Sequence, residues 1–200
     1  MAAATGKIIT IGRSYGAGGR SIGRQVAEDL KIPYYDSELL AETAKSSGLD
    51  EKYLASVDEK EINDAALYMS VGYMSPTYSS VRQIAANAQR EVIEKIASEG
   101  PCVIVGRRAN EILAERPNLL SVFITASVES RIIHVMNREH LTEKEAKKKV
   151  LRADKERAAY YNQFSGNEWG YAATYDLCIN TDMLGADHAA QIIEFVAGKT

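Results

Sequence analysis

Apolar residues occur along the chain in short continuous runs, and between these runs they recur with the spacing of a helix. Short runs rich in β-branched residues are typical of buried strands, and they predict strands at residues 7–11, 33–36, 101–105, 119–125 and 177–180. Between the runs, apolar positions recur every three or four residues, as they do on the buried face of a helix. Strands separated by helices predict an α/β fold with a parallel sheet that is covered by helices on both faces.

The helical spacing of apolar residues and the positions of capping residues together predict where the helices lie. They predict helices at about 22–30 and 81–96, from near Ser127, from Thr142, and at about 186–196. Thr142 and Glu145 have the spacing of a capping box, which fixes the start of that helix. Residues 37–98 are expected to be helical with interruptions, and the weakly periodic part at 50–78 is expected to be a mobile insertion.

Composition and charge narrow the classes of function. Hydrophobic residues make up 46% of the 200 residues and charged residues 26%, as in soluble globular proteins. A net charge of −3 at pH 7 gives no overall positive field, so neither nucleic acid nor a membrane is expected as a partner. No apolar run approaches membrane-spanning length, and Cys102 and Cys178 are predicted to be buried free thiols. A cytoplasmic location is therefore expected.

A glycine-rich segment joins the first predicted strand to the helix that follows. A loop without side chains lets several backbone N–H groups point at one phosphate, and the next helix adds the positive end of its dipole. The order strand, glycine loop, helix therefore predicts a nucleoside triphosphate site. Its residues are Ser14, Tyr15, Gly16, Ala17, Gly18, Gly19, Arg20 and Ser21.

This loop departs from the usual P-loop pattern, G-x-x-x-x-G-K-[ST]. If Arg20 and Ser21 stand for the lysine and the hydroxyl residue, Gly19 fits but Ser14 occupies the first glycine position. If the Gly-Ala-Gly of residues 16–18 is aligned with that of nucleoside monophosphate kinases, Gly19 replaces the lysine. In both alignments Arg20 is the nearest substitute for the missing lysine, and Ser21 is the candidate hydroxyl ligand of Mg²⁺. Arginine keeps the charge but is not interchangeable with lysine.

A dinucleotide-binding loop is the alternative interpretation. Its pattern, G-x-G-x-x-G, has Gly16 and Gly18 but would place Ser21 at the third glycine. Asp36 ends the second predicted strand at roughly the distance of a ribose-binding acid, which favours this alternative. The same residue is also the candidate carboxylate near magnesium. The three histidines lack an accompanying ligand set, so a histidine metal cluster is not expected.

Several short motifs occur in the order that they have in cytidylate kinases. They are Gly16-Ala17-Gly18, Tyr35-Asp36-Ser37, Val81-Arg82-Gln83, Val105-Gly106-Arg107, and Thr125 to Arg131. With the further segments Asp154 to Tyr161 and Tyr175 to Leu177, the chain resembles the cytidylate kinase-like family over almost its whole length, residues 50–78 excepted. The resemblance implies a P-loop fold of the nucleoside monophosphate kinase type. It implies one domain over residues 1–200, with a helical monophosphate-binding insertion at about 37–98 and a lid at about 138–160.

The resemblance also implies transfer of the γ-phosphoryl group of ATP, with Mg²⁺, to a nucleoside monophosphate. Asp36 and Ser37 would lie beside the base or sugar of the acceptor, and Arg82 and Arg107 would hold its phosphate. Arg108 stands where true cytidylate kinases have an aspartate that helps to recognise cytosine. We therefore place Arg108 with the substrate-binding residues, and CMP and dCMP are candidate acceptors among others.

The resemblance places Asp154 and Arg157 on the lid side of the site. Apolar positions within residues 146–161 define one face of the predicted lid helix, and at about 100° per residue Arg157 falls within that face whereas Arg152 points away. A buried guanidinium needs a partner, which is either Asp154, three residues earlier, or bound phosphate. Arg157, Asp154 and Arg20 are the candidate catalytic residues.

These observations lead to three hypotheses. The first is an ATP-dependent phosphotransferase that acts on a nucleoside monophosphate or another small phosphorylated acceptor. The second is a nucleotide-binding regulatory protein that keeps the fold without the chemistry, which the missing loop lysine permits. The third is a dinucleotide-binding oxidoreductase. The oligomeric state does not follow from the sequence.

Overall fold

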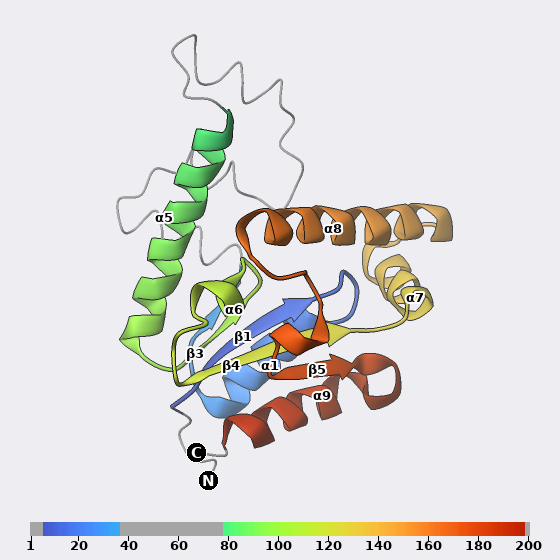
Figure 1. Cartoon of the computed structure of the whole chain (residues 1–200). Helices are drawn as coiled ribbons and strands as arrows, with labels where there is room; N and C mark the ends of the chain where they lie inside the picture. The colour runs from blue at the N-terminus through green and yellow to red at the C-terminus, as the bar shows by residue number, and fades with distance from the viewer. Residues whose placement is uncertain (1–5, 37–77, 199–200) are drawn as a thin grey trace.

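The computed structural model describes residues 6–36 and 78–198, apart from the side chains of residues 78–82, 84 and 85 (Figure 1). All five predicted strands are present within these residues. They are β1 (Ile8–Arg13), β2 (Tyr34–Tyr35), β3 (Cys102–Val105), β4 (Leu119–Thr125) and β5 (Leu177–Asn180). Every pairing is parallel, in the order β2-β3-β1-β4-β5. The mobile insertion predicted at 50–78 lies outside the described residues except for residue 78, and of the interrupted helical segment predicted at 37–98 only residues 78–98 are described.

Helices cover both faces of the sheet, as predicted. They are α1 (Gly19–Leu30), α5 (Tyr78–Glu99), α6 (Ala109–Ile112), α7 (Val128–Glu139), α8 (Glu143–Phe164) and α9 (Thr181–Ala197), with a short 3₁₀ turn at Ala172–Thr174. One apolar cluster joins Ile9 and Ile11 of β1 to α1 and α9. On the opposite face, Ile8 packs with α5 and α6. Because successive side chains of a strand point to opposite faces, β1 contributes to both clusters.

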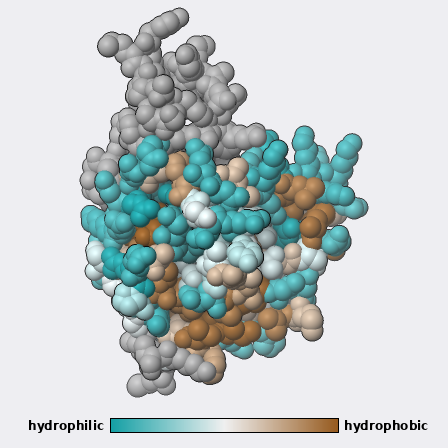
Figure 2. Space-filling view, in the orientation of Figure 1, coloured by the Kyte–Doolittle hydropathy of each residue, from teal (hydrophilic) through white to brown (hydrophobic). Residues whose placement is uncertain are grey.

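The ends of α7 and α8 follow the predicted caps. The Ser127 side chain accepts a hydrogen bond from the Ser130 amide, and Thr142 forms the predicted capping box with Glu145. The α8 surface that faces away from the sheet is hydrophilic, with Lys147, Lys148 and Lys149 exposed (Figure 2). In Figure 1 this helix lies over the ends of the strands where the glycine loop emerges.

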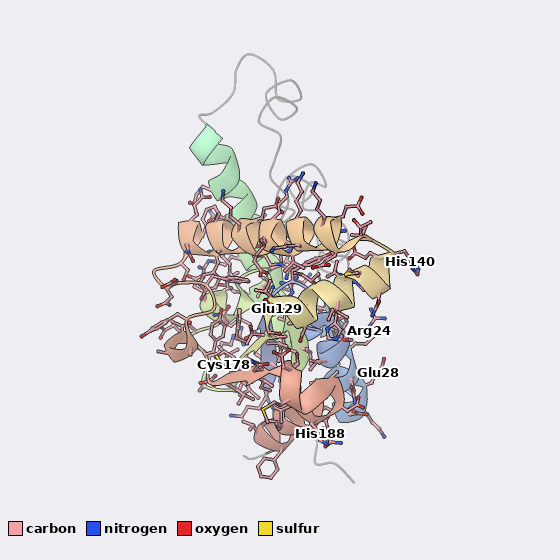
Figure 3. All side chains as sticks on the ribbon, turned by 90° about the vertical axis from the view of Figure 1, so that its right-hand side faces the viewer. Arg24, Glu28, Glu129, His140, Cys178 and His188 are labelled. Carbon is pink, nitrogen blue, oxygen red and sulfur yellow. The ribbon has the colours of Figure 1, made fainter. Side chains whose placement is uncertain are left out.

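The structure extends one sequence prediction and corrects another at the C-terminal part of the sheet. The helix predicted at about 186–196 is present but is preceded by a further helical part that Asn180 caps and that begins at Thr181, with Gly185 (φ 70°) forming a kink between the two parts. Cys102 is buried as predicted, but Cys178 is exposed (Figure 3). β5 lies at the edge of the sheet, and Ile179 packs against the core while Cys178 points to the other face. Among the described residues, no helix is long and apolar enough to span a membrane.

Candidate phosphate-binding site

The glycine loop follows β1, the central strand of the sheet, and leads directly into α1. Gly16 and Gly18 both have φ 85°, a left-handed conformation that glycine adopts without steric cost. Gly18 caps α1 without a side-chain hydrogen bond, and the first turn of α1 holds no acidic residue. The positive end of the α1 dipole therefore points at the loop with neither a side-chain cap at Gly18 nor an acidic residue in the first turn, which is an arrangement suited to an anion.

Helices α7 and α8 hold the loop from the side opposite α1. The Tyr15 amide donates to Asp154 Oδ1 at 2.7 Å, and Arg131 donates through one guanidinium nitrogen to Tyr15 O at 3.1 Å and to Asp154 Oδ2 at 2.5 Å. The Nε of Arg131 donates to Ala126 O at 3.1 Å. Asp154 therefore binds Arg131 and the loop backbone, and it is not the partner of Arg157, for which the sequence had left Asp154 and bound phosphate open.

Arg131 is the residue of this site that the sequence reasoning missed. It is buried on the same face of α7 as Ile132 and Val135. The periodicity argument that singled out Arg157 on α8 applies equally to Arg131, since an arginine within an apolar stripe needs a buried partner. That signal was available in the sequence, whereas the identity of its partner, Asp154, depends on how α7 packs against α8.

Gly16 allows α7 to approach the loop closely. A Cβ atom on Gly16 would lie 2.9 Å from Arg131 O and 3.1 Å from both Arg131 Cβ and Val135 Cγ2. His134 Nδ1 lies 3.2 Å from Gly16 O. Glycine at this position therefore serves two purposes, the left-handed backbone and the packing of α7.

Arg157 lies on the inner face of α8, as predicted. It donates to Arg13 O at 3.1 Å, and its guanidinium carbon lies 5.2 Å from the centre of the Tyr15 ring. Arg138 lies 5.3 Å from the same ring, so two cations contact one aromatic side chain. Arg152 points away from the core, with a side chain that is 59% exposed and paired with Glu156.

A charged network extends from the loop to α7 and α8. The Tyr15 hydroxyl donates to Glu139 Oε1 at 2.8 Å, Arg138 pairs with the same oxygen at 2.6 Å, and Lys149 pairs with Glu139 Oε2. Burial opposes ionisation of Glu139, but the hydrogen bonds from Lys149, Arg138 and Tyr15 outweigh it and lower the pKa of the carboxyl to about 2. Burial, and the hydrogen bond to Glu139, raise the pKa of Tyr15. At neutral pH the protonated hydroxyl of Tyr15 therefore donates a hydrogen bond to the ionised carboxylate of Glu139.

A second group of polar side chains lies where α1 begins. Asp36, after β2, is 3% exposed, and its Oδ2 lies 3.5 Å from Arg20 Nε and 3.5 Å from the Tyr34 hydroxyl. Tyr34 also donates to Arg20 O at 3.3 Å. The Ser21 hydroxyl donates to Gly18 O at 2.8 Å and is exposed. Asp36 and Arg20 are therefore together at the loop, while Ser37 lies outside the described residues.

The end of β3 places two arginines in an unusual backbone conformation. Gly106, Arg107 and Arg108 have φ angles of 81°, 58° and 56°. Non-glycine residues in this region carry conformational strain, which is concentrated at functional sites in proteins. Both arginine side chains are buried. The backbone of Arg82 lies near the start of α5, and its side chain is outside the described part of the chain.

Arg108 is engaged by α6 and α8. Its guanidinium carbon lies 4.8 Å from the Phe164 ring and 5.6 Å from the Tyr160 ring. The same guanidinium donates to Glu111 Oε2 at 3.2 Å and to Phe164 O at 3.1 Å. These contacts give Arg108 a structural role, and the prediction that it also binds substrate stays a prediction.

The histidines of α7 and α9 lie far apart. Figure 3 shows His140 at the end of α7 and His188 on α9, on different parts of the molecule. Among the residues that the structure describes, no group of three or more His, Cys, Asp or Glu side chains is placed to hold a metal ion. The Asp36 carboxylate and the Ser21 hydroxyl, the two candidate ligands of Mg²⁺, both lie near the start of α1, and the Asp154 carboxylate is a further oxygen group beside the loop.

Comparisons with known proteins identify the family and the fold of the chain. Residues 8–183 match the model of the cytidylate kinase-like family. A cytidylate kinase from Methanopyrus kandleri is 24% identical over 94% of this chain and 91% of its own length. A crystal structure of an uncharacterised protein from Eubacterium ventriosum is 31% identical, with a TM-score of 0.76 over 97% of this chain and 99% of that one. Shikimate kinase from Bacteroides thetaiotaomicron shares the fold at 13% identity, with a TM-score of 0.55 over 95% of this chain and 97% of its own.

The parallel sheet, with a glycine loop that leads from β1 into α1, thus has the fold of P-loop kinases. The family match extends from β1, at the start of the described residues, through β5 to the first turn of α9. The chain belongs to the cytidylate kinase-like family.

Proposed function

We propose that this protein transfers the γ-phosphoryl group of ATP to a nucleoside monophosphate. The observation that carries the proposal is the start of α1, where two left-handed glycines precede a helix without a side-chain cap. Such a terminus binds phosphate through backbone amides and the helix dipole. Two curated relatives are cytidylate kinases, from Methanopyrus kandleri and Sulfurisphaera tokodaii, which supports a nucleotide as acceptor.

Phosphoryl transfer requires mainly positioning and positive charge around the group in transit. In our proposal, residues 14–21 bind the triphosphate of ATP and Arg20 supplies charge at the start of α1. Arg157 reaches the loop from α8, and Asp154 acts as a positioning residue because it holds Arg131 and the Tyr15 amide. Helix α8 is thereby proposed as part of the lid, within a single domain.

Magnesium is the cofactor that this chemistry implies. Mg²⁺ prefers oxygen ligands, and it is commonly held by one or two protein oxygens together with phosphates and water. Asp36 and Ser21 fit this preference: the carboxylate is buried at the start of α1, and the Ser21 hydroxyl keeps its lone pairs because it acts as a donor to Gly18 O. When bound, the ion neutralises charge on the phosphate oxygens.

The acceptor side of the proposal rests on Asp36, Ser37, Arg82 and Arg107. Arg107 is 8% exposed and follows the C-terminal end of β3. Ligands of parallel α/β folds bind beyond the C-terminal ends of the strands. We assign the acceptor phosphate to Arg107 and Arg82. CMP and dCMP are the first acceptors to test, because the curated relatives are cytidylate kinases.

The direct test is product formation with a panel of acceptors. The full-length protein is incubated with ATP, Mg²⁺ and either CMP, dCMP, UMP, AMP or GMP, with shikimate and gluconate as acceptors of a different class. Products are identified by anion-exchange chromatography. We expect a nucleoside diphosphate from at least one monophosphate. Binding of ATP without any product would refute the kinase and favour a regulatory protein, and stabilisation by NAD(P) alone would favour the oxidoreductase.

Two substitutions separate the donor side from the acceptor side. Arg20→Ala should lower kcat more than it raises the KM of the acceptor, because the charge acts on the group in transfer. Arg82→Ala should mainly raise the KM of the acceptor. Arg116→Ala is the matched control, since Arg116 donates to the carbonyls of Ala97 and Glu94 just before β4 begins, at the end of the sheet opposite the loop. Equal small effects of the first two substitutions would show that the site is misplaced.

A further inference from the structure

The structure identifies which residue stands at the position of the missing loop lysine. In the P-loop pattern the lysine directly follows the second glycine and opens the helix. Here α1 begins at Gly19, directly after the left-handed Gly18. If Gly18 is the second glycine, the lysine position falls on Gly19 and the first glycine position, five residues before Gly18, falls on Arg13. In this register a glycine and a cation have exchanged places.

The packing of these two residues agrees with an exchange. A Cβ atom on Gly19 would lie 2.6 Å from Arg13 Cβ, which is closer than real Cβ contacts, and 3.0 Å from Arg13 Cγ. The stem of Arg13 therefore fills the space that a side chain on residue 19 would need. In the usual pattern the arrangement is reversed: residue 13 has no side chain, and a lysine on residue 19 has room.

The Arg13 side chain leaves β1 on the face that α1 covers. It lies on the same side of the strand as Ile9 and Ile11, which pack in the cluster with α1, and it is 9% exposed. Burial and the charge of Asp36 raise the pKa of the Tyr34 hydroxyl, while the charges of Arg20, Arg24 and Arg13 lower it. The Arg13 charge thus acts on the polar group formed by Tyr34, Asp36 and Arg20 at the start of α1.

We propose that Arg13 is the phosphate-binding cation of this site, in place of the P-loop lysine. The charge reaches the phosphates of the nucleotide from the last residue of β1 instead of from the first turn of α1. A guanidinium offers a planar fork of donors that suits two phosphate oxygens at once, where a lysine offers a point charge. This inference rests on the proposed function, since it assumes that a nucleoside triphosphate occupies the loop.

The same geometry explains the glycine at residue 19. An arginine at residue 13 requires glycine at residue 19, because any side chain at residue 19, lysine included, would collide with the aliphatic part of Arg13. Arg20, whose side chain is 52% exposed and lies beside Asp36, is then a separate charge and not the substitute for the lysine.

The test measures the affinity of the full-length protein for the Mg²⁺ complex of a non-hydrolysable ATP analogue, by isothermal titration calorimetry. Arg13→Gln keeps the stem that packs on Gly19 and removes the charge, and we expect it to weaken binding at least tenfold. Arg13→Lys should lose less than Arg13→Gln. Arg116→Ala, which removes an equal charge elsewhere, should bind within twofold of the unmodified protein.

The exchange itself is tested by Arg13→Gly, Gly19→Lys and the double variant. Each single variant should bind the analogue at least tenfold more weakly, Arg13→Gly because the cation is gone and Gly19→Lys because its stem collides with Arg13. The double variant restores the usual pattern and should recover binding to within about threefold. Arg13→Gln that binds within threefold of the unmodified protein, or a folded double variant no better than Arg13→Gly, would overturn the proposal.

This readout separates the inference from the proposed function. A protein that binds the analogue but phosphorylates no acceptor refutes the kinase, and the Arg13 variants still decide the identity of the cation. A protein that phosphorylates a monophosphate with unchanged kinetics after Arg13→Gln refutes only the inference. Melting temperatures without ligand distinguish a loss of binding from a loss of folded protein.

Discussion

Replacing Asp154 by alanine tests how strongly α8 is attached to the glycine loop. The carboxylate accepts hydrogen bonds from Arg131 at 2.5 Å and from the Tyr15 amide at 2.7 Å. The side chains of Arg131 and Asp154 are 7% and 18% exposed. Without the carboxylate, Arg131 keeps only carbonyl acceptors at Ala126 and Tyr15, and the Tyr15 amide loses its acceptor.

The expected cost follows from the burial of this pair. Removing one partner of a buried ion pair costs about 3–5 kcal/mol, because the remaining charge has no counter-ion. Asp154 keeps some contact with water, so we expect the lower end, about 3 kcal/mol of the free energy of unfolding. For a domain of this size, each kcal/mol lowers the melting temperature by about 2–4 °C, which gives a fall of roughly 6–12 °C.

Urea denaturation and thermal melting, both followed by circular dichroism, measure this change. Lys147→Ala is the control on the same helix, because Lys147 is exposed on the outer surface of α8, and we expect about 0.5 kcal/mol or less. Asp154→Asn removes the charge but keeps an acceptor for the Tyr15 amide, so its effect should fall between the two. A loss below about 1 kcal/mol for Asp154→Ala would refute the reasoning.

Three further predictions follow from single contacts. The pKa of Glu139 is lowered from 4.5 to about 2 in the folded protein, so its contribution to stability is complete above about pH 4.5 and is lost as the pH falls towards 2. The Glu139→Gln variant should lack this pH dependence in urea titrations at pH 3–7, and identical pH profiles of the two proteins would contradict the prediction. Cys178 is exposed, whereas Cys102 is buried and its pKa is raised to about 11. A thiol reagent should therefore label Cys178 in the folded protein and Cys102 only after unfolding, and equal labelling rates of the two cysteines by mass spectrometry would contradict this. Gly16→Ala combines φ 85° with a contact of 2.9 Å and should cost about 2 kcal/mol, so an unchanged melting temperature would count against the packing described.

Local rules of the sequence predicted the features that depend on neighbouring residues. Ser127 and Thr142 start α7 and α8 because a hydroxyl that accepts from an amide three residues later needs no tertiary contact. Helical periodicity was enough to orient Arg157 and Arg152, since both lie on one continuous helix. The order of strands and helices likewise predicted the parallel sheet, because parallel strands require crossover connections.

Features that depend on how distant segments pack were not predictable in the same way. Asp154 pairs with Arg131, 23 residues earlier, because α7 lies against α8 and not because of any spacing within α8. Cys178 is exposed because β5 lies at the edge of the sheet, and a strand's position in the sheet does not follow from its composition. The contact between Arg13 and Gly19 likewise appears only when the end of β1 meets the start of α1.

The end of β3 illustrates how a strained backbone is held in place. Arg107 and Arg108 both adopt the left-handed region, which costs of order 1–3 kcal/mol for each residue and persists only where the surroundings fix it. The contacts of Arg108 with Phe164, Tyr160 and Glu111 provide such surroundings, and they come from α8 and α6. Arg108 therefore fixes the backbone from which Arg107 projects, and it links that backbone to the same helix that carries Asp154 and Arg157. Through α8, the end of β3 and the glycine loop are joined to one rigid element, so any movement of this helix would act on both sides of the proposed reaction at once.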